Sequence, residues 1–431
     1  MPSLPVRSAA LAAALFAAGG RAAALQPLEA FLQGAREVGP DDAEARSGRE
    51  QAEAEARVAL GRALPGLALH GSYTRNQYET AVEFPLPGQN PIAITITPRD
   101  AWSGSLTLTV PLVDLSSFER IAAARTSAGA ARAGERATAL GVEAQVAQGY
   151  YQLLADLALT DASEKALQVA RVSLSVASER REAGTAALLD VDRARAEVES
   201  DVQQLAAARL AVAVAARALA TLTGLWPELA SPVPAEDDLR PEAPLETFEP
   251  ADKDLPSVLS AEENRAAAEE QASAQRRALL PSLSASFTEQ ASNASGFVGH
   301  DAYWQATLAL SWSADLSSLP AIRSQEAAAR AARARELRAT LAARAAIENA
   351  YGTVATDIER SRSARTGAQV SAEASEQALE RYRAGAASQL ELLQAQRDAL
   401  SAEAARIEAD ANLKNARAQL RLAAGRSLAA P

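Results

Sequence analysis

Two pairs of short segments alternate between apolar and polar residues, which is the period of a β-strand with two unlike faces. "PGLALHGSY" places Leu67, Leu69 and Tyr73 on one face, and "WSGSLTLTVPL" alternates from Trp102 to Leu112. "PSLSASF" and "YWQATLALSWS" repeat the pattern about two hundred residues later. Lengths of about 9–11 residues suit a tilted membrane-spanning strand, although two half-buried hairpins of a soluble protein would alternate in the same way.

Long helical stretches follow each strand pair. Residues 112–226 and 321–430 contain no proline and are rich in Ala, Leu, Glu, Gln and Arg. These residues favour helices, whereas proline breaks them. In each stretch an Ala-Gly step follows directly on an Arg- and Glu-rich segment, at Gly184 and Gly385. Because glycine after a helix end is a C-cap signal, each stretch predicts a helical hairpin. The leading arm of the first hairpin would measure roughly 100 Å at about 1.5 Å per residue.

The two halves of the chain are copies of one pattern. Tyr150 and Tyr351 match at an offset of 201 residues, as do Gly184 and Gly385. A single period of this length indicates two copies rather than a repeat array. The sequence predicts a signal peptide (1–24), a first repeat (25–226), a proline-rich acidic linker (227–256), a second repeat (257–425) and a C-terminal tail (426–431). The first repeat would contain N-terminal helices, a strand pair (64–112) and a helical hairpin (115–224). The second repeat would contain a helix, a strand pair (280–313) and a helical hairpin (316–425).

The N-terminus has the pattern of an export signal. Arg7 precedes the apolar run "SAALAAALFAAGG", and small residues at Ala22 and Ala24 permit cleavage before Leu25. An uncleaved anchor is the alternative, but the run is too short to span a bilayer. No other run approaches the roughly 18 apolar residues of a spanning helix. The sequence therefore predicts no membrane helix after the leader, so any membrane segment would be a β-barrel.

Composition excludes several functions. The 431 residues carry a net charge of −11, too acidic for a general nucleic-acid binder, which needs clustered Lys and Arg. The absence of cysteine excludes disulfides, thiolate metal sites and cysteine nucleophiles. His70 and His300 have no metal-ligand spacing around them, and no phosphate loop or nucleophile motif occurs. We therefore expect no enzymatic activity, no cofactor and no metal.

Four strands are too few to close a barrel, because even the smallest bacterial single-chain barrels need about eight. Open strand edges cannot face lipid, since each unpaired backbone group there costs several kcal/mol. If the strands span a membrane, several identical chains must pool them, and three chains would supply twelve. Trp102, Trp304 and Trp312 lie near strand ends, where membrane-interface aromatics are typical.

Several short sequence segments together resemble a known family. They are "RALPGLALHGSY" and "RALLPSLSASF" at the strands, "VPLVD" at the strand-to-helix step, and "AG…LLDV" and "AG…LELLQA" at the turns. In this order, and doubled, they resemble the TolC family of outer-membrane efflux proteins (outer membrane factors). The resemblance implies an α+β membrane protein: a homotrimer whose twelve-stranded β-barrel, with four strands per protomer, continues into a long α-helical barrel across the periplasm. The second copy has Ser311-Trp312-Ser313 where the first has Val110-Pro111-Leu112, which predicts a different strand-to-helix bend.

The resemblance also implies a gate at the two glycine turns, which would form the periplasmic tips of the hairpins. By distance from Gly385, Tyr382 matches the family's constriction tyrosine, and Glu391 and Gln394 match two pore-lining aspartates. Asp190 matches a hydrogen-bonding partner in the first hairpin. Since Gln394 is not acidic, we expect one carboxylate ring rather than two, and such a ring would attract cations. The alternative is that Glu391 and Asp190 simply favour the first turn of a helix.

The hairpin-tip residues expected to dock an adaptor are Arg181, Gly184, Arg383 and Gly385. The alternatives for the arginines near both turns are pairing with neighbouring helices or, more frequently for such residues, solvation on a helix face.

These expectations combine into one functional hypothesis. The chain would be the passive outer-membrane channel-tunnel of a tripartite efflux or type I secretion system in a Gram-negative bacterium, extending into the periplasm. Its partners would be a periplasmic adaptor (membrane fusion protein), an inner-membrane pump and outer-membrane lipid. The alternative is a periplasmic coiled-coil adaptor or scaffold without a pore, although such a protein would normally have one hairpin rather than two.

Overall fold

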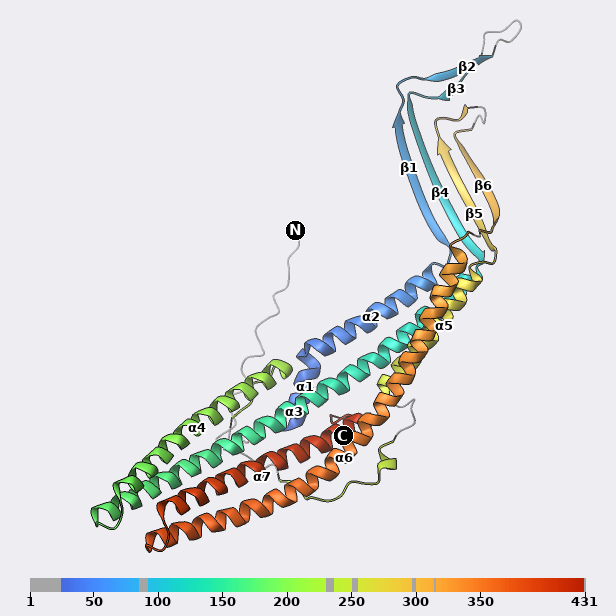
Figure 1. Cartoon of the computed structure of the whole chain (residues 1–431). Coiled ribbons are helices and arrows are strands. Elements are labelled where there is room, and N and C mark those ends of the chain that lie inside the picture. Colours follow the sequence, from blue (N-terminus) through green and yellow to red (C-terminus); the bar gives the residue numbers. More distant parts are fainter. Residues whose placement is uncertain are drawn as a thin grey trace, which may run out of the picture. The chain divides into compact units, whose positions relative to one another are not determined.

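The computed structural model describes residues 25–84, 92–229, 236–249, 255–296, 300–313 and 315–429, so the expected leader lies outside the described residues. Helices account for most of them (Figure 1). The elements in chain order are α1 (Leu28–Val38), α2 (Pro40–Gly61), β1 (Gly66–Arg75), β2 (Thr80–Phe84), β3 (Ile92–Thr97), β4 (Asp100–Val113), α3 (Leu115–Glu182), α4 (Leu188–Thr223), the 3-10 turn η1 (Leu245–Thr247), α5 (Pro256–Arg277), β5 (Ser282–Ser292), β6 (Ala302–Ser311), α6 (Ser318–Arg383) and α7 (Gln389–Ala423).

The chain divides into two compact units, and each unit takes segments from both sequence repeats. The sheet unit comprises residues 44–137 and 252–342, and the hairpin unit comprises the described parts of 1–43, 138–251 and 343–431. The repeats are therefore units of sequence but not of packing. Helices α3 and α6 each have residues in both units.

The sheet unit holds a four-stranded antiparallel sheet in the order β1-β4-β5-β6. Its register sets Leu67 opposite Leu108 and Leu108 opposite Phe287, so the predicted apolar face is continuous across neighbouring strands. The other face carries hydroxyl and amide groups. Thr107 and Thr288, for example, share a hydrogen bond of 3.1 Å between their Oγ1 atoms. The two faces predicted from the period of two are therefore present.

The connection between β1 and β4 contains two short strands that were not predicted from the sequence. Strands β2 and β3 pair with each other in a separate two-stranded sheet. Their segments "TAVEF" and "IAITIT" are rich in the β-branched and aromatic residues that favour strands. The proline and glycine residues of the connection had outweighed this signal.

The two strand-to-helix steps differ, as the sequence predicted. In the first repeat, a bulge at the end of β4 lets Pro111 pair with Ser284 and Val113 with Leu283, which leaves Leu112 as an extra residue. Strand β6 ends at Ser311 without such a shift. Beyond these ends the two steps are alike. The Asp114 carboxylate accepts hydrogen bonds from the backbone N–H groups of the two serines that follow Leu115, and Asp315 is bonded to Ser317 and Ser318 in a similar way.

The hairpin unit contains both helical turns. Within it, α3 lies beside α4, and α6 beside α7 (Figure 1). Helix α1, which the sequence analysis did not resolve from α2, inserts Phe31 and Leu32 between α3 and α4, where they pack against Leu153 and Leu219. Alanine is frequent among the buried positions of this unit. Such small side chains allow helix backbones to approach closely, which suits long helices with few aromatic residues.

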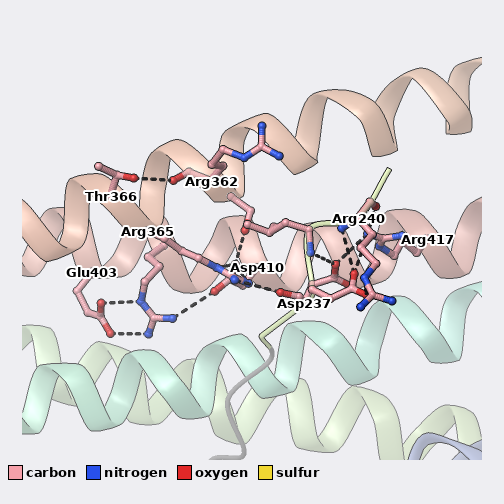
Figure 2. A network of polar contacts seen from close by, with 12 residues as sticks. Asp237, Arg240, Arg362, Arg365, Thr366, Glu403, Asp410 and Arg417 are labelled. Atoms are coloured by element: carbon pink, nitrogen blue, oxygen red, sulfur yellow. Dashed lines mark hydrogen bonds and ion pairs between the residues drawn. The ribbon is translucent and has the colours of Figure 1, made fainter. Parts of the chain in front are cut away.

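The described part of the linker, residues 236–249, is mostly irregular and is bound to the second hairpin by ion pairs and hydrogen bonds. Arg417 of α7 lies 2.9 Å from Asp237 and also forms an ion pair with Glu242 (Figure 2). Arg365 of α6 donates to the carbonyl of Asp237 at 3.0 Å and contacts the buried carboxylate of Asp410 at 2.9 Å (Figure 2). The linker therefore joins α6 and α7 at a point well away from their turn.

One prediction from the sequence, that no stretch after the leader is apolar enough for a membrane-spanning helix, is wrong. Among the residues that the structure describes, one helix, α4, has a window of 18 residues with a mean hydropathy of 1.7, which is long and apolar enough to cross a membrane. The sequence predicts no such helix after the leader, so this finding corrects that prediction. The cause is a run of small apolar residues, "LAVAVAARALATL", broken by a single arginine. A helix from the core of a soluble protein passes the same test, and only 28% of this window is buried.

Candidate functional site

The two hairpin turns have the same backbone geometry. Gly184 and Gly385 have φ angles of +75° and +78°, the left-handed region that side chains disfavour. In the first turn the N–H of Thr185 donates to the carbonyl of Arg180, and in the second the N–H of Ala386 donates to that of Arg381, both at 2.8 Å. Each glycine therefore ends one arm of a hairpin, as the sequence predicted.

The helices that leave the two turns are capped differently. In the second turn, Ser388 and Glu391 form a reciprocal capping box: the Ser388 N–H donates to the Glu391 carboxylate at 2.7 Å, and the Glu391 N–H donates to the Ser388 hydroxyl at 3.2 Å. In the first turn the corresponding residue is Ala187, which has no hydroxyl. Its N–H donates to Asp190 at 3.3 Å, so only half of the box forms.

These caps bear on the predicted carboxylate ring. Hydrogen bonds from the backbone and side chain of Ser388 hold the pKa of Glu391 below its ordinary value, so this carboxylate stays ionised. Its observed contacts are those of a helix cap, which is the alternative role considered from the sequence. Asp190 lies within 4.0 Å of Arg193 on its own helix. A pore-lining role for either carboxylate is not tested by these contacts within one chain.

An arginine of the first hairpin covers the predicted constriction tyrosine of the second. The Arg180 guanidinium lies 4.6 Å from the centre of the Tyr382 ring and also donates to the Tyr382 carbonyl. Tyr382 is only 2% exposed, and among the residues that the structure describes its hydroxyl has no hydrogen-bond partner. Burial raises the pKa of this hydroxyl. Arg180 is one of the arginines near the turns, and of the alternatives for them it therefore follows pairing with a neighbouring helix rather than solvation.

Further contacts join the two hairpins beyond the turns. Arg397 of α7 makes a bidentate pair with Glu197 of α4, with distances of 2.9 and 3.0 Å from its Nε to the two carboxylate oxygens. Gln396 donates to the hydroxyl of Ser173 on α3 at 2.7 Å. Ser173 and Glu197 are both buried, so these polar contacts satisfy groups that would otherwise lack water.

Asp201 lies one helical turn beyond Glu197 and is 6% exposed. Burial and the nearby Glu197 charge raise the pKa of Asp201 to about 6, although the Arg397 charge acts in the opposite direction. A cavity of about 850 Å³ opens beside these residues, lined by α3, α4, α6 and α7. The Glu197–Arg397 ion pair therefore joins the hairpins here, and beside it lies a buried acid, Asp201, whose pKa is raised to about 6.

The other predicted tip residues are exposed. Gln394 donates to Asp398 on its own helix at 2.8 Å, and Arg383 pairs with Glu380 at 2.9 Å. Arg181 is exposed at the end of α3. The structure thus brings Tyr382 together with Arg180. For Arg180, as for the other arginines near the turns, the sequence left both pairing with a neighbouring helix and solvation open. Among the described residues, the hydrogen bond of Gln394 and the ion pair of Arg383 are both made within their own helices.

The predicted interface tryptophans lie at both ends of the sheet. Trp102 and Trp304 are near the ends of β4 and β6 that are distant from the helices, and Trp304 stacks on Phe287 with ring centres 5.9 Å apart. Trp312 follows the opposite end of β6 and donates its indole N–H to the carbonyl of Leu279 at 3.0 Å. All three rings are exposed in a single chain.

Comparison with known proteins gives the family. The model of the outer membrane efflux protein family matches residues 31–225 and 251–426, which is most of both repeats. The chain belongs to this family. The resemblance to the TolC family found in the sequence is thereby confirmed. Members of this efflux family are channel proteins rather than enzymes, and an adaptor without a pore is not supported.

Individual relatives of this efflux protein are distant. The probable efflux pump outer membrane protein TtgC of Pseudomonas putida is 31% identical over 167 residues, which are 38% of this chain and 34% of TtgC. The fusaric acid resistance protein FusA of Burkholderia cepacia is 29% identical over 197 residues, which are 45% of this chain and 36% of FusA. The match thus spans about a third of the length of these curated relatives. The outer membrane protein VceC of Vibrio cholerae shares the fold, with a TM-score of 0.78 and 20% identity over 93% of this chain and 96% of VceC.

Glu197 and Arg397, which join the hairpins of this efflux protein, were not among the residues predicted from the sequence. A signal for them exists in α4, where the buried positions recur at intervals of three and four residues: Ala194, Glu197, Asp201, Leu205, Ala208, Val212, Ala216, Leu219 and Thr223. Two acids within an otherwise small or apolar stripe indicate buried charges that need a cation. The sequence alone does not show that Arg397, about two hundred residues away, supplies it.

Proposed function

We propose that this chain forms, as a homotrimer, the passive outer-membrane exit duct of a tripartite efflux system. The four strands of each copy would contribute to one twelve-stranded barrel. The helical hairpins would extend into the periplasm as an α-helical barrel that is closed at its tips in the resting state.

The observation that carries this proposal is the two-faced sheet. One face carries mostly apolar side chains, with Glu289 of β5 among them, and the other carries mostly hydroxyl and amide groups, with His70 among them. Lipid on one side and a water-filled lumen on the other would favour such a division. The edge strands β1 and β6 leave the sheet open within one chain. Since open edges are not tolerated in lipid, closure needs further copies. Tryptophans at both ends of the sheet would mark the two membrane surfaces.

The resting gate would be held by the contacts between the hairpin tips. Arg180 covers Tyr382 at the turns, and Arg397 pairs with Glu197 further along the helices. Opening would move the second hairpin away from the first and break both contacts. Glu391 would present its ionised carboxylate at the narrow end of the duct, where three copies form a ring that attracts cations.

The partners would be a periplasmic adaptor and an inner-membrane pump, because the chain has no motif for nucleotide hydrolysis or other chemistry that could drive transport. Arg181, Gly184, Arg383 and Gly385 at the turns would meet the adaptor. The exposure of both arginines is consistent with such a contact.

Conductance of the purified protein in a planar lipid bilayer tests the duct and its gate together. We expect a small resting conductance, and a larger one in an Arg180→Ala, Arg397→Ala double variant, because the Arg180–Tyr382 and Arg397–Glu197 contacts between the hairpins are then lost. Arg209→Ala is the matched control, because Arg209 makes its salt bridge with Glu164 inside the first hairpin and should leave the conductance unchanged. A protein that never conducts, with or without these substitutions, would contradict the proposal.

A further inference from the structure

The two strand pairs have the same hydrogen-bonding register, residue for residue. The β1–β4 pairs run from Gly66↔Thr109 to Arg75↔Asp100, and the β5–β6 pairs run from Ser282↔Ser311 to Ala291↔Ala302. A shift of 216 residues carries β1 onto β5, and a shift of 202 carries β4 onto β6, and under these shifts every pair of the first set becomes a pair of the second. The sheet of one chain is therefore two copies of one hairpin.

The copies are joined inside the chain by one contact, β4 against β5. This contact includes Thr107↔Thr288, whose hydroxyls touch, and Leu108↔Phe287 on the opposite face. Strands β6 and β1, at the two edges, are the counterparts of β4 and β5. If identical chains form a ring in which all strand hairpins are equivalent, the β6–β1 contact between neighbouring chains must repeat the β4–β5 contact within a chain.

We infer that β6 of one copy pairs with β1 of the next copy in the register of β4 with β5. This inference rests on the proposed function, because it needs copies arranged in a ring, and it assigns the residues of their seam. The same two shifts carry Thr107 to Ala309 and Thr288 to Ser72. The seam pairs, with β1 of one copy first and β6 of the partner subunit second, are Arg75↔Ala306, Thr74↔Thr307, Tyr73↔Leu308, Ser72↔Ala309, Gly71↔Leu310 and His70↔Ser311.

The side chains at this seam support the assigned register independently, because the two shifts were taken from backbone pairing alone. Tyr73 meets Leu308 on the apolar face, and Thr74 meets Thr307 on the polar face, so both faces continue across the seam. A slip of one residue would put every apolar side chain of β1 opposite a polar-face residue of β6. Strand directions also agree, since β1 and β6 run antiparallel when placed edge to edge in a ring.

Cysteine cross-linking tests the register directly, because the chain contains no cysteine of its own. The seam variant carries Ser72→Cys and Ala309→Cys. Two variants slipped by two residues combine Ser72→Cys with Thr307→Cys or with Ser311→Cys, on the same polar face. Within one chain β1 and β6 are three strand spacings apart, roughly 14 Å. This is too far for a disulfide, so every cross-link at these positions joins two chains.

Outer membranes from cells that express each full-length variant are oxidised mildly and run on non-reducing gels. We expect covalent dimers and trimers from the seam variant in roughly fivefold or greater excess over either slipped variant. The reason is that directly opposite Cβ atoms are about 4.5–5.5 Å apart and diagonal neighbours about 7–8 Å. Thr107→Cys with Thr288→Cys is the positive control, since this equivalent pair should close within a single chain.

The outcomes separate the inference from the proposed function. If a slipped variant gives the most cross-linking while the detergent-extracted protein is trimeric, the register is wrong and the proposed function stands. A trimeric protein in which no pair cross-links, although the control pair closes, also overturns the register. A monomeric protein in which only the control pair closes overturns both.

Discussion

The strand pairs and the hairpin tips of the two repeats have diverged to different degrees. The strand pairs keep one register throughout, whereas the tips share their backbone turn but not their side chains. Tyr382 in the second tip corresponds to Arg181 in the first, and the capping Ser388 corresponds to Ala187. A β-barrel that closes by pairing between copies of one chain requires strand pairs with equivalent edges. A gate requires that one hairpin tip can move relative to the other. The difference therefore follows from the two tasks we propose.

The largest effect is expected from a charge on the apolar face of the sheet. Leu108→Arg should strongly reduce the amount of folded protein in the outer membrane, because arginine facing lipid near the bilayer midplane costs about 2–4 kcal/mol. Leu310→Arg, at the equivalent position of the second copy, should have a similar effect. The measurement is the amount of protein that fractionates with the outer membrane.

Thr107→Arg is the matched control, because Thr107 neighbours Leu108 but points to the polar face. We expect this variant to reach the membrane in nearly normal amounts. Equal losses from Thr107→Arg and Leu108→Arg would show that the two faces are not in different surroundings.

Much of the sheet could be predicted from the sequence, because a strand with one apolar face has a period of two that survives in short segments. The long hairpins were equally visible, since Gly184 and Gly385 each follow an Arg- and Glu-rich segment within a proline-free helical stretch. Strands β2 and β3 were missed because short strands between proline and glycine residues resemble a loop. The pairing of β4 with β5 was not predictable, since nothing local in either strand specifies a partner about 180 residues away.

The next largest effect concerns the two turns, which should respond alike because their backbones are alike. Gly184→Ala and Gly385→Ala should each destabilise the hairpin unit by roughly 1–2 kcal/mol, since a side chain disfavours the left-handed region. The midpoint of thermal unfolding, followed by circular dichroism, measures the effect. Gly141→Ala, inside α3 with open space around it, should instead be neutral or slightly stabilising.

A pH effect is expected at the contact between the hairpins. Because the pKa of Asp201 is raised to about 6 from an ordinary value of 3.8, its stabilising contribution is fully present below the ordinary value and is lost as the pH rises through about 6. The hairpin unit should therefore be more stable at pH 5 than at pH 7 by about 1 kcal/mol from this group. Asp201→Asn should remove this difference, as measured by thermal unfolding at both pH values.

Asp192→Asn provides the control on the same helix, because Asp192 is exposed. This variant should keep the pH difference of the unchanged protein. If Asp201→Asn keeps that difference as well, Asp201 is not the group responsible.

The smallest effect exchanges the caps of the two tips. Ser388→Ala removes the hydroxyl that accepts from the Glu391 N–H and should cost about 1 kcal/mol. Ala187→Ser should complete the half-formed box in the first tip and stabilise its helix by about 0.5–1 kcal/mol. Thermal unfolding of the two variants, run side by side, would refute this comparison if both substitutions changed stability in the same direction.

The candidate site was less accessible to sequence reasoning than the fold. Tyr382 was found by its distance from a glycine turn, but its contact with Arg180 depends on how two hairpins about two hundred residues apart lie side by side. Glu197 and Arg397 were missed for the same reason. A helical period reveals that an acid lies in a buried stripe, but it does not identify the helix that supplies the compensating charge.

The central claim is that strands too few to close a barrel within one chain are pooled between copies inside a membrane. The mass of the detergent-extracted protein, measured by light scattering with the detergent contribution subtracted, tests this claim most directly. We predict a mass of three chains for protein recovered from the outer membrane. A single chain that stays soluble in buffer without detergent would contradict the account.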